Sequence, residues 1–304
     1  MNNNQQKEIF QGVWPAMFTP VFDNGDLNVK ELEKLIELLI EQDVDGLYLL
    51  GSTGQGFLFN EKQRREITEI ALQINNNRLP VMVQVGALNT DESVRLAKHA
   101  EQCGVQAVSA VGPIYYAASP AMALEHYRKI ASSVEIPFFP YQIGNAVMNK
   151  EMIQQLKKIK NMRGMKLTTL NLVEISNIHN DVGPGWKLFS GADELLCHAA
   201  LCGTAGAIGS TYNLIGYACK DIRQKFLAGQ VTTGIAFMLR LQKLIEQVLP
   251  CIWTFFNRAM LLKHGINIGR PKPPLLFPDL AWSDEEILSV VEELESFSIN
   301  NIPA

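Results

Sequence analysis

The chain has 304 residues, of which 47% are hydrophobic and 19% charged, and its formal net charge is −4. This is a globular composition, large enough for one large domain or two modest ones. It shows no basic excess and no Lys/Arg-rich block, so we expect no nucleic-acid partner and no binding to an anionic membrane. The opening residues, MNNNQQKEIF, lack the apolar core of a signal peptide, and we therefore expect a cytoplasmic protein.

The cysteines are odd in number and form no CxxC pair, which favours buried thiols packed as small hydrophobic side chains. They are Cys103, Cys197, Cys202, Cys219 and Cys251.

A repeating unit organises the chain, and the stretch LEKLIELLIEQDVDGLYLLGST shows it best. Leu32, Leu35 and Leu39 share one face of a predicted helix, and Asn28 with Glu31 predicts a capping box at its start. The run GLYLLG follows as a strand without polar alternation, which is typical of a parallel sheet buried on both faces.

Eight such strands are predicted, and helical stretches that begin at Asn60, Thr90 and Ser119–Pro120 lie among them. The strands are Gly12–Met17, Gly46–Gly51, Pro80–Gly86, Ala107–Val111, Pro137–Gln142, Arg163–Thr168, Trp186–Ser190 and Ala205–Gly209. Alternation of this kind predicts an α/β fold, a (β/α)8 barrel, with a doubly wound sheet as the alternative.

Three further helices are predicted after the last strand, at Thr232–Val248, Trp253–His264 and Asp284–Phe297. Because no Pro/Gly/Ser-rich linker precedes them, we expect a helical appendage packed on the barrel. The expected division is an N-terminal tail (1–11), the barrel (12–230) and the appendage (231–304).

The window from Leu195 to Cys219 contains no Asp, Glu, Lys or Arg and is long enough to span a bilayer. It breaks at CGTAG, however, and it contains several polar residues. We therefore predict a buried helix, a tight turn and a buried strand here, and no membrane segment.

In a barrel, the chemistry gathers where the strands end. The second predicted strand ends in GSTGQG, whose backbone N–H groups can surround an anion, with the Ser52 and Thr53 hydroxyls as extra donors. A carboxylate is the favoured anion, since no Gly-Lys-Ser/Thr follows; the alternative is an ordinary strand-to-helix turn. No HxH or HExxH spacing occurs, so no catalytic metal is expected.

Lys166 lies between Met165 and Leu167 in a predicted buried strand. A buried ammonium group is costly unless it is paired or loses its proton, and a neutral amine is a nucleophile. The neighbouring strand ends near Tyr141, whose phenol could relay protons. The alternative is that Lys166 extends to the barrel rim and Tyr141 only lines the wall.

Several motifs in this order resemble the N-acetylneuraminate lyase / dihydrodipicolinate synthase family of class I (Schiff-base) pyruvate aldolases. The resemblance covers nearly the whole chain, and the lyase branch is the closer match. The motifs are GSTG at 51–54, AVGPIYY at 110–116, Tyr141, Lys166 with Thr168, SGADE at 190–194 and AIGSTYN at 207–213. The arginine that the synthases usually carry after the strand-end tyrosine is absent from QIGNAVMNK.

The resemblance implies a role for each motif. Lys166 would form the Schiff base, Tyr141 would handle the proton of the C4 hydroxyl, and Ser52 with Thr53 would bind the pyruvyl carboxylate. The sugar portion would be bound by Thr168, Gly191, Asp193, Glu194 and Ser210. Tyr115, rather than Tyr116, would reach into a neighbouring subunit of a homotetramer built as a dimer of dimers. No cofactor is implied, because the lysine imine itself is the electron sink.

Purely structural roles are the alternative for some of the residues that the resemblance assigns to sugar binding. Asp193 and Glu194 also suit the first turn of a helix, where carboxylates favour the positive end of the dipole. Ser210 could be a small residue needed for packing beside Gly209.

The sequence also departs from the family pattern, at Gln55 where Glu is usual, at Gln142-Ile143-Gly144, at Gly112-Pro113 and in the loop GNAVMNK. An aromatic side chain of WTFF, Phe255 or Phe256, is a further candidate for the pocket.

The expected activity is therefore reversible cleavage of N-acetylneuraminate to N-acetylmannosamine and pyruvate. One alternative is another 2-keto-3-deoxy sugar-acid aldolase or dehydratase. The other is a non-catalytic barrel that senses a keto acid.

Overall fold

The computed structural model describes residues 9–116, 119–143 and 149–299, the last without the side chain of Ile299. Eight parallel strands form one sheet in the order β1-β8-β7-β6-β5-β4-β3-β2. A bridge between Ala16 and Tyr48, with the Met17 N–H donating to the Tyr48 carbonyl at 2.9 Å, joins the first strand to the second. The (β/α)8 barrel is confirmed, and the doubly wound sheet is excluded.

All eight predicted strands are present, most of them one or two residues shorter at an end. They are β1 (Gly12–Pro15), β2 (Leu47–Leu49), β3 (Val81–Gln84), β4 (Ala107–Val111), β5 (Phe138–Ile143), β6 (Gly164–Thr168), β7 (Lys187–Ser190) and β8 (Gly206–Gly209).

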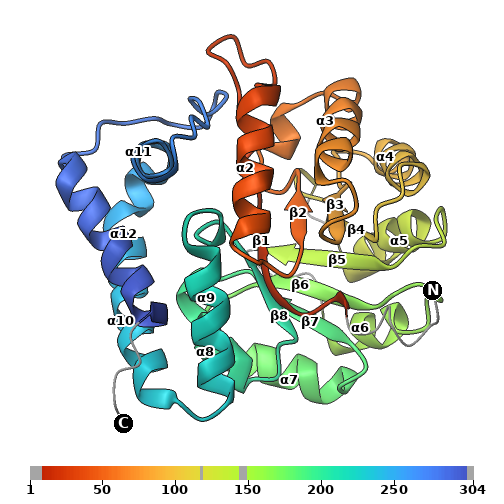
Figure 1. The fold of residues 1–304 in the computed structure, drawn as a ribbon. Helices are drawn as coiled ribbons and strands as arrows, with labels where there is room; N and C mark the ends of the chain where they lie inside the picture. Colours follow the sequence, from red (N-terminus) through yellow and green to blue (C-terminus); the bar gives the residue numbers. More distant parts are fainter. Residues whose placement is uncertain (1–8, 117–118, 144–148, 300–304) are drawn as a thin grey trace.

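Helices follow the strands and form the outer layer of the barrel (Figure 1). They are α2 (Val29–Glu41), α3 (Glu61–Asn75), α4 (Thr90–Gln102), α5 (Pro120–Ala131), α6 (Lys150–Leu156), α7 (Leu172–Val182), α8 (Leu196–Leu201) and α9 (Tyr212–Leu227), with short 3-10 turns η1 (Gly56–Leu58) and η2 (Asp193–Leu195).

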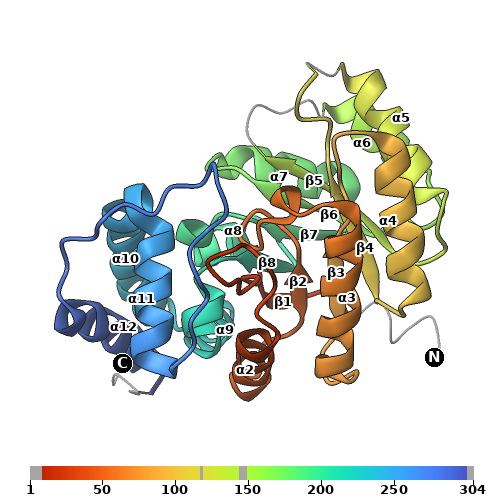
Figure 2. The ribbon, with the colours of Figure 1, turned by 90° about the horizontal axis from the view of Figure 1, so that it is seen from above.

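The predicted appendage forms three long helices beside α9 on one flank of the barrel (Figure 2). They are α10 (Val231–Val248), α11 (Ile252–His264) and α12 (Asp284–Ile299), and the short turn η3 (Leu249–Cys251) joins the first two. The proposed domain limits at residues 11 and 230 remain a prediction, and residues 1–8 of the tail lie outside the described residues.

The predicted helix starts at Asn60, Thr90 and Ser119–Pro120 are confirmed to within one residue, and the capping box predicted at Asn28 is only half right. Asn60 and Gln63 form a reciprocal capping box at the start of α3. Asn28 caps α2, since its side chain accepts from the Glu31 N–H, but the reciprocal half of the predicted box is wrong. The Glu31 carboxylate instead accepts from the Lys34 amine and from the Asn267 N–H, because the chain after α11 approaches it there.

The predicted helix, turn and strand in the window from Leu195 to Cys219 correspond to α8, the turn before β8, and β8 itself. Across the described ranges, none of the helices combines the length and the apolar character that crossing a bilayer requires.

Aromatic side chains fill the lower part of the barrel interior. Phe10, Trp14, Phe139 and Phe189 are all fully buried, and their ring centroids lie 5.0–6.1 Å apart in successive contacts. Offset and edge-on contacts of this kind add to the stabilisation from burial. These rings fill the barrel interior near the starts of the strands, and the polar side chains of the interior lie toward the carboxyl ends of the strands.

Candidate active site

Lys166 lies inside the barrel on β6, with 5% of its surface exposed. Its Nζ atom is 4.3 Å from the ring centroid of Tyr141 and 4.5 Å from that of Tyr48. No ion pair to Lys166 is found among the described residues. Ring faces attract an ammonium group much less than a carboxylate would, so burial is not offset as in a salt bridge. The alternative, in which Lys166 extends to the solvent at the barrel rim, does not agree with its exposed fraction of 5%.

Tyr141 is the Cα partner of Lys166 in the pairing of β5 with β6, so the two side chains face the same interior. Its hydroxyl lies 3.3 Å from Thr168 Oγ1, and its carbonyl accepts from the Tyr127 hydroxyl at 3.2 Å. The strand register thus holds the phenol, the amine and a second hydroxyl together.

Tyr48 contributes a second ring that the sequence interpretation missed. Burial raises the pKa of Tyr48 far above its ordinary value, and its hydroxyl donates to Ser109 Oγ at 3.2 Å. The phenol is thus neutral and its hydroxyl is engaged with β4. Period-two alternation in LYL, which turns Leu47 and Leu49 outward and Tyr48 inward, was the available signal.

Gly191, directly after β7, gives these side chains their space. A Cβ atom on this residue would lie 2.0 Å from Thr168 Oγ1 and 3.1 Å from Lys166 Cε. Only a residue without a side chain therefore allows the hydroxyl and the amine to occupy their positions.

Asp193 is almost fully buried in η2 and faces the loop after β8. Its Oδ2 atom accepts from the N–H and from the hydroxyl of Thr211, both at 2.8 Å. Burial raises the pKa of Asp193 to about 6, although the two bonds from Thr211 and the charge of Lys166 act in the opposite direction. One carboxylate oxygen is therefore occupied in holding the neighbouring loop.

Two predicted residues contact each other across the carboxyl-terminal rim of the barrel. Thr53, after β2, and Ser210, after β8, place their hydroxyl oxygens 2.7 Å apart. Ser52, next to them, is exposed. A carboxylate at this point would meet hydroxyl groups from two different loops.

A cavity of about 210 Å³ opens beside this hydroxyl pair, between the rim and α11. It is lined by Phe18, Ser52, Thr53, Ser210, Ile252, Trp253, Phe256 and Leu275. Of the two predicted candidates, Phe256 lines this cavity, together with Trp253 of the same WTFF stretch, whereas Phe255 packs against Trp282 with ring centroids 6.0 Å apart. Lys166 does not line this space.

Two other predicted residues, Glu194 and Tyr115, make no hydrogen bond or ion pair with Lys166 among the described residues. Glu194 is half-buried, and its carbonyl accepts from Gln242 Nε2 on α10 at 2.8 Å. Tyr115 and Tyr116 are 80% and 70% exposed, with their rings in edge-on contact.

The positions that depart from the family pattern have structural roles of their own. The Gln55 side chain accepts from the Lys272 N–H at 2.6 Å, which ties the rim loop to the segment after α11. Gln142 Nε2 donates to Glu174 Oε1 at 3.2 Å, on the outer face of β5. Residues 144–148, most of the divergent loop, lie outside the described residues.

The prediction for the cysteines is right for Cys197 and Cys219, which are buried, and wrong for the other three, which are partly exposed. Helix ends explain the difference. Cys103 and Cys202 follow the last turns of α4 and α8, and Cys251 ends η3, where the chain leaves the packed layer.

The fold and the site together define a (β/α)8 barrel with a buried amine between two tyrosine rings, ringed by hydroxyl-bearing loops. Residues 9–286 match the model of the dihydrodipicolinate synthetase family. The chain belongs to this family.

Curated relatives within the family carry one recurrent name. The chain is 32% identical to the N-acetylneuraminate lyase of Citrobacter koseri over 78% of this chain and 80% of the relative. It is 30% identical to that of Salmonella agona over 93% of this chain and 95% of the relative.

Solved structures agree with the fold. The N-acetylneuraminate lyase of Mycoplasma synoviae has a TM-score of 0.84 at 26% identity, covering 96% of this chain and 99% of that one. The sialic acid aldolase of Ruminococcus gnavus has a TM-score of 0.86 at 22% identity, covering 96% and 97%, and supports the architecture alone.

Proposed function

We propose that this protein is a Schiff-base aldolase, a carbon–carbon lyase that cleaves N-acetylneuraminate reversibly to N-acetylmannosamine and pyruvate. The names of its relatives support the substrate. The observation that carries the chemistry is the buried Lys166 amine between the rings of Tyr48 and Tyr141. Carbonyl chemistry uses lysines with a poorly solvated amine, and in the described part of the chain no carboxylate forms an ion pair with Lys166.

The reaction proceeds through a covalent imine. The Lys166 amine adds to the C2 carbonyl of the open-chain sugar acid, and loss of water gives the protonated imine. Tyr141 removes the proton of the C4 hydroxyl, the C3–C4 bond breaks, and its electron pair flows into the imine to form an enamine. The aldehyde is N-acetylmannosamine. Protonation of the enamine at C3 and hydrolysis release pyruvate and regenerate the amine.

The remaining residues bind the two ends of the substrate. Ser52 and Thr53 hold the pyruvyl carboxylate, supported by the hydroxyl pair that Thr53 makes with Ser210. Thr168, Gly191, Asp193, Glu194 and Ser210 contact the sugar portion. No cofactor takes part, since the imine supplies the electron sink.

The assembly that we propose is a cytoplasmic homotetramer in which Tyr115 of one subunit enters the site of the next. Its ring is 80% exposed in the single chain, which leaves it free for such a contact.

The test is reduction with borohydride in the presence of pyruvate, followed by tryptic digestion. Reductive capture at Lys166 blocks cleavage there, so the digest should contain one peptide from Gly164 to Lys187 with the mass of a reduced pyruvyl group. Lys166→Ala should give no adduct and no turnover. An adduct elsewhere, or unchanged activity of this variant, overturns the mechanism.

A second candidate, a 2-keto-3-deoxy sugar-acid aldolase or dehydratase, is favoured by one observation. The family's usual Asn after Tyr141 is Gln142 here, and the loop that follows differs as well. Pyruvate release from N-acetylneuraminate and from 2-keto-3-deoxygluconate should be compared at equal concentration. Much faster turnover of the second compound would replace the first assignment while leaving the lysine chemistry in place.

A further inference from the structure

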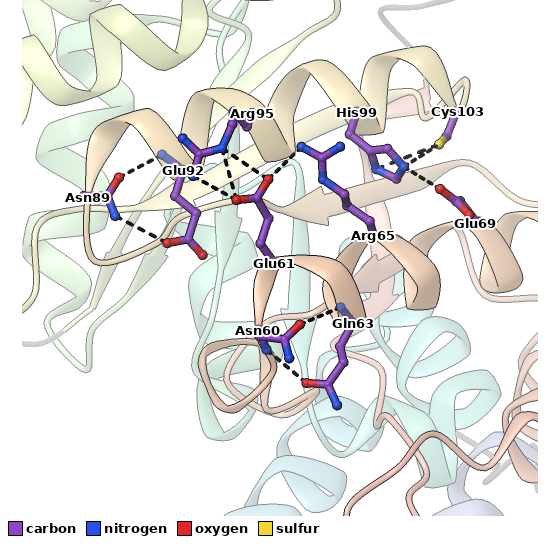
Figure 3. Close-up of polar contacts among 10 residues, drawn as sticks. All are labelled: Asn60, Glu61, Gln63, Arg65, Glu69, Asn89, Glu92, Arg95, His99 and Cys103. Carbon is purple, nitrogen blue, oxygen red and sulfur yellow. Dashed lines mark hydrogen bonds and ion pairs between the residues drawn. The ribbon is translucent and has the colours of Figure 1, made fainter.

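Three side chains that the aldolase chemistry does not use converge on the outer layer of helices. Glu69 of α3, His99 of α4 and Cys103 at the end of α4 each offer a ligand atom, and these atoms lie within 4.8 Å of one another (Figure 3). His99 Nε2 is 2.7 Å from Glu69 Oε1 and 3.5 Å from Cys103 Sγ. Nitrogen, sulfur and oxygen thus meet at one point.

The helix geometry fixes two of the three ligands. His99 and Cys103 are four residues apart and therefore share one helix face. The Cys103 N–H donates to the His99 carbonyl at 3.0 Å, which keeps the helical spacing up to the cap. The carbonyl end of a helix also carries the negative pole of its dipole, which favours a cation.

The distances resemble those between the ligands of a tetrahedral zinc ion. With bonds of about 2.0–2.1 Å to nitrogen and about 2.3 Å to sulfur, such ligands lie roughly 3.5 Å apart. The His99–Cys103 separation already has this value. The Glu69 oxygen has to move away from His99 by less than an ångström, and it already lies within 4.8 Å of the Cys103 sulfur. Its side chain is 58% exposed, so it has room to adjust both distances.

We propose that Glu69, His99 and Cys103 bind a zinc ion that joins α3 to α4, with water as the fourth ligand. The carboxylate, imidazole and thiolate form a donor set that suits this borderline-soft cation. The position excludes a role in the aldol reaction. Helices of a β/α unit run back against their strands, so the end of α4 lies near the start of β4, at the opposite end of the barrel from Lys166.

The chain offers an internal control. His198 and Cys202 have the same spacing at the end of α8, but within the described ranges no third ligand accompanies them. A chelate that needs only the His-x3-Cys pair would form at both places, whereas the proposed site needs Glu69 as well.

Cobalt(II), as a spectroscopic substitute for zinc, should be titrated into the reduced, metal-free protein. We expect one equivalent per chain to produce a thiolate-to-cobalt charge-transfer band that zinc abolishes. Cys103→Ser should lose the band, Glu69→Gln should weaken binding at least tenfold, and Cys202→Ser should behave as the wild type. Zinc should also raise the melting temperature of the wild type and of Cys202→Ser, but not of Cys103→Ser.

The outcomes separate the proposal from simpler explanations. A wild type without the band means that the trio is only a hydrogen-bonded cluster. A band that survives in Cys103→Ser, or that disappears in Cys202→Ser, places the metal elsewhere. Circular dichroism of each metal-free variant shows whether it is folded, and a folded Cys103→Ser that still gains stability from zinc overturns the site.

Discussion

Gly191→Ala is the most direct test of how the reacting groups are packed. The new methyl carbon would lie 2.0 Å from Thr168 Oγ1. Carbon–oxygen contacts are rarely closer than about 3.3 Å, so the Thr168 hydroxyl has to move by about 1.3 Å. Its 3.3 Å contact with the Tyr141 hydroxyl is long already and cannot survive such a shift.

Two losses of different kinds follow from this displacement. Overpacking in a close-packed region costs about 1–3 kcal/mol of unfolding free energy. A mutation that misplaces the bound substrate by about 1 Å costs on the order of 100-fold in rate, and Thr168 is one of the residues proposed to position the substrate. We therefore expect kcat/KM to fall by about 100-fold in a variant that remains folded at 25 °C.

The assay follows pyruvate release from N-acetylneuraminate, together with urea unfolding of the same sample. Gly185→Ala is the matched control, because a Cβ atom at Gly185 meets nothing within 4 Å. If Gly191→Ala retains wild-type kcat/KM, or loses no more than Gly185→Ala, the close packing of Gly191 with Thr168 has no part in catalysis.

Three further substitutions, at Tyr141, Asp193 and Thr53, test individual contacts, and Tyr48→Phe serves as a control for the first. Tyr141→Phe should lower kcat by 10²–10⁴-fold, as expected for loss of a general base, while borohydride still traps pyruvate on the variant. Tyr48→Phe alters a ring equally close to the amine and should retain most of the activity. Asp193 has a folded pKa of about 6 against an ordinary 3.8, so the folded state binds its proton more tightly and the buried charge costs stability above pH 6. Relative to Asp193→Asn, the wild type should therefore gain about 1.4 kcal/mol of unfolding free energy between pH 7.5 and pH 5 in urea titrations, and a flat difference would contradict the raised pKa. Thr53→Val should raise KM about tenfold with little change in kcat, because it removes one ground-state hydroxyl contact; an unchanged KM would argue against carboxylate binding there.

The barrel could be predicted because its signals are local. Apolar strands such as Ala107–Val111 lie between amphipathic stretches, and this alternation repeats eight times. The three final helices have clear periodic patterns and were also placed to within a few residues.

The parts that could not be predicted depend on contacts between distant segments. The Asn28–Glu31 box failed because Asn267, far along the chain, attracts the carboxylate. The two hydrogen bonds that Thr211 donates to Asp193, and the position of Tyr48 beside Lys166, depend on the strand order and on which side chains point into the barrel. The Glu69–His99–Cys103 cluster has no motif, since its third member comes from a different helix.

The aromatic floor of the barrel has a consequence for the order of events in a catalytic cycle. Phe10, Trp14, Phe139 and Phe189 fill the barrel interior near the starts of the strands, so we expect substrate and products to pass at the carboxyl ends of the strands. In the imine mechanism proposed above, the pyruvate fragment stays bonded to Lys166 until the imine is hydrolysed, whereas the sugar is held without a covalent bond. The proposed mechanism therefore predicts ordered release, with the sugar first and the keto acid last.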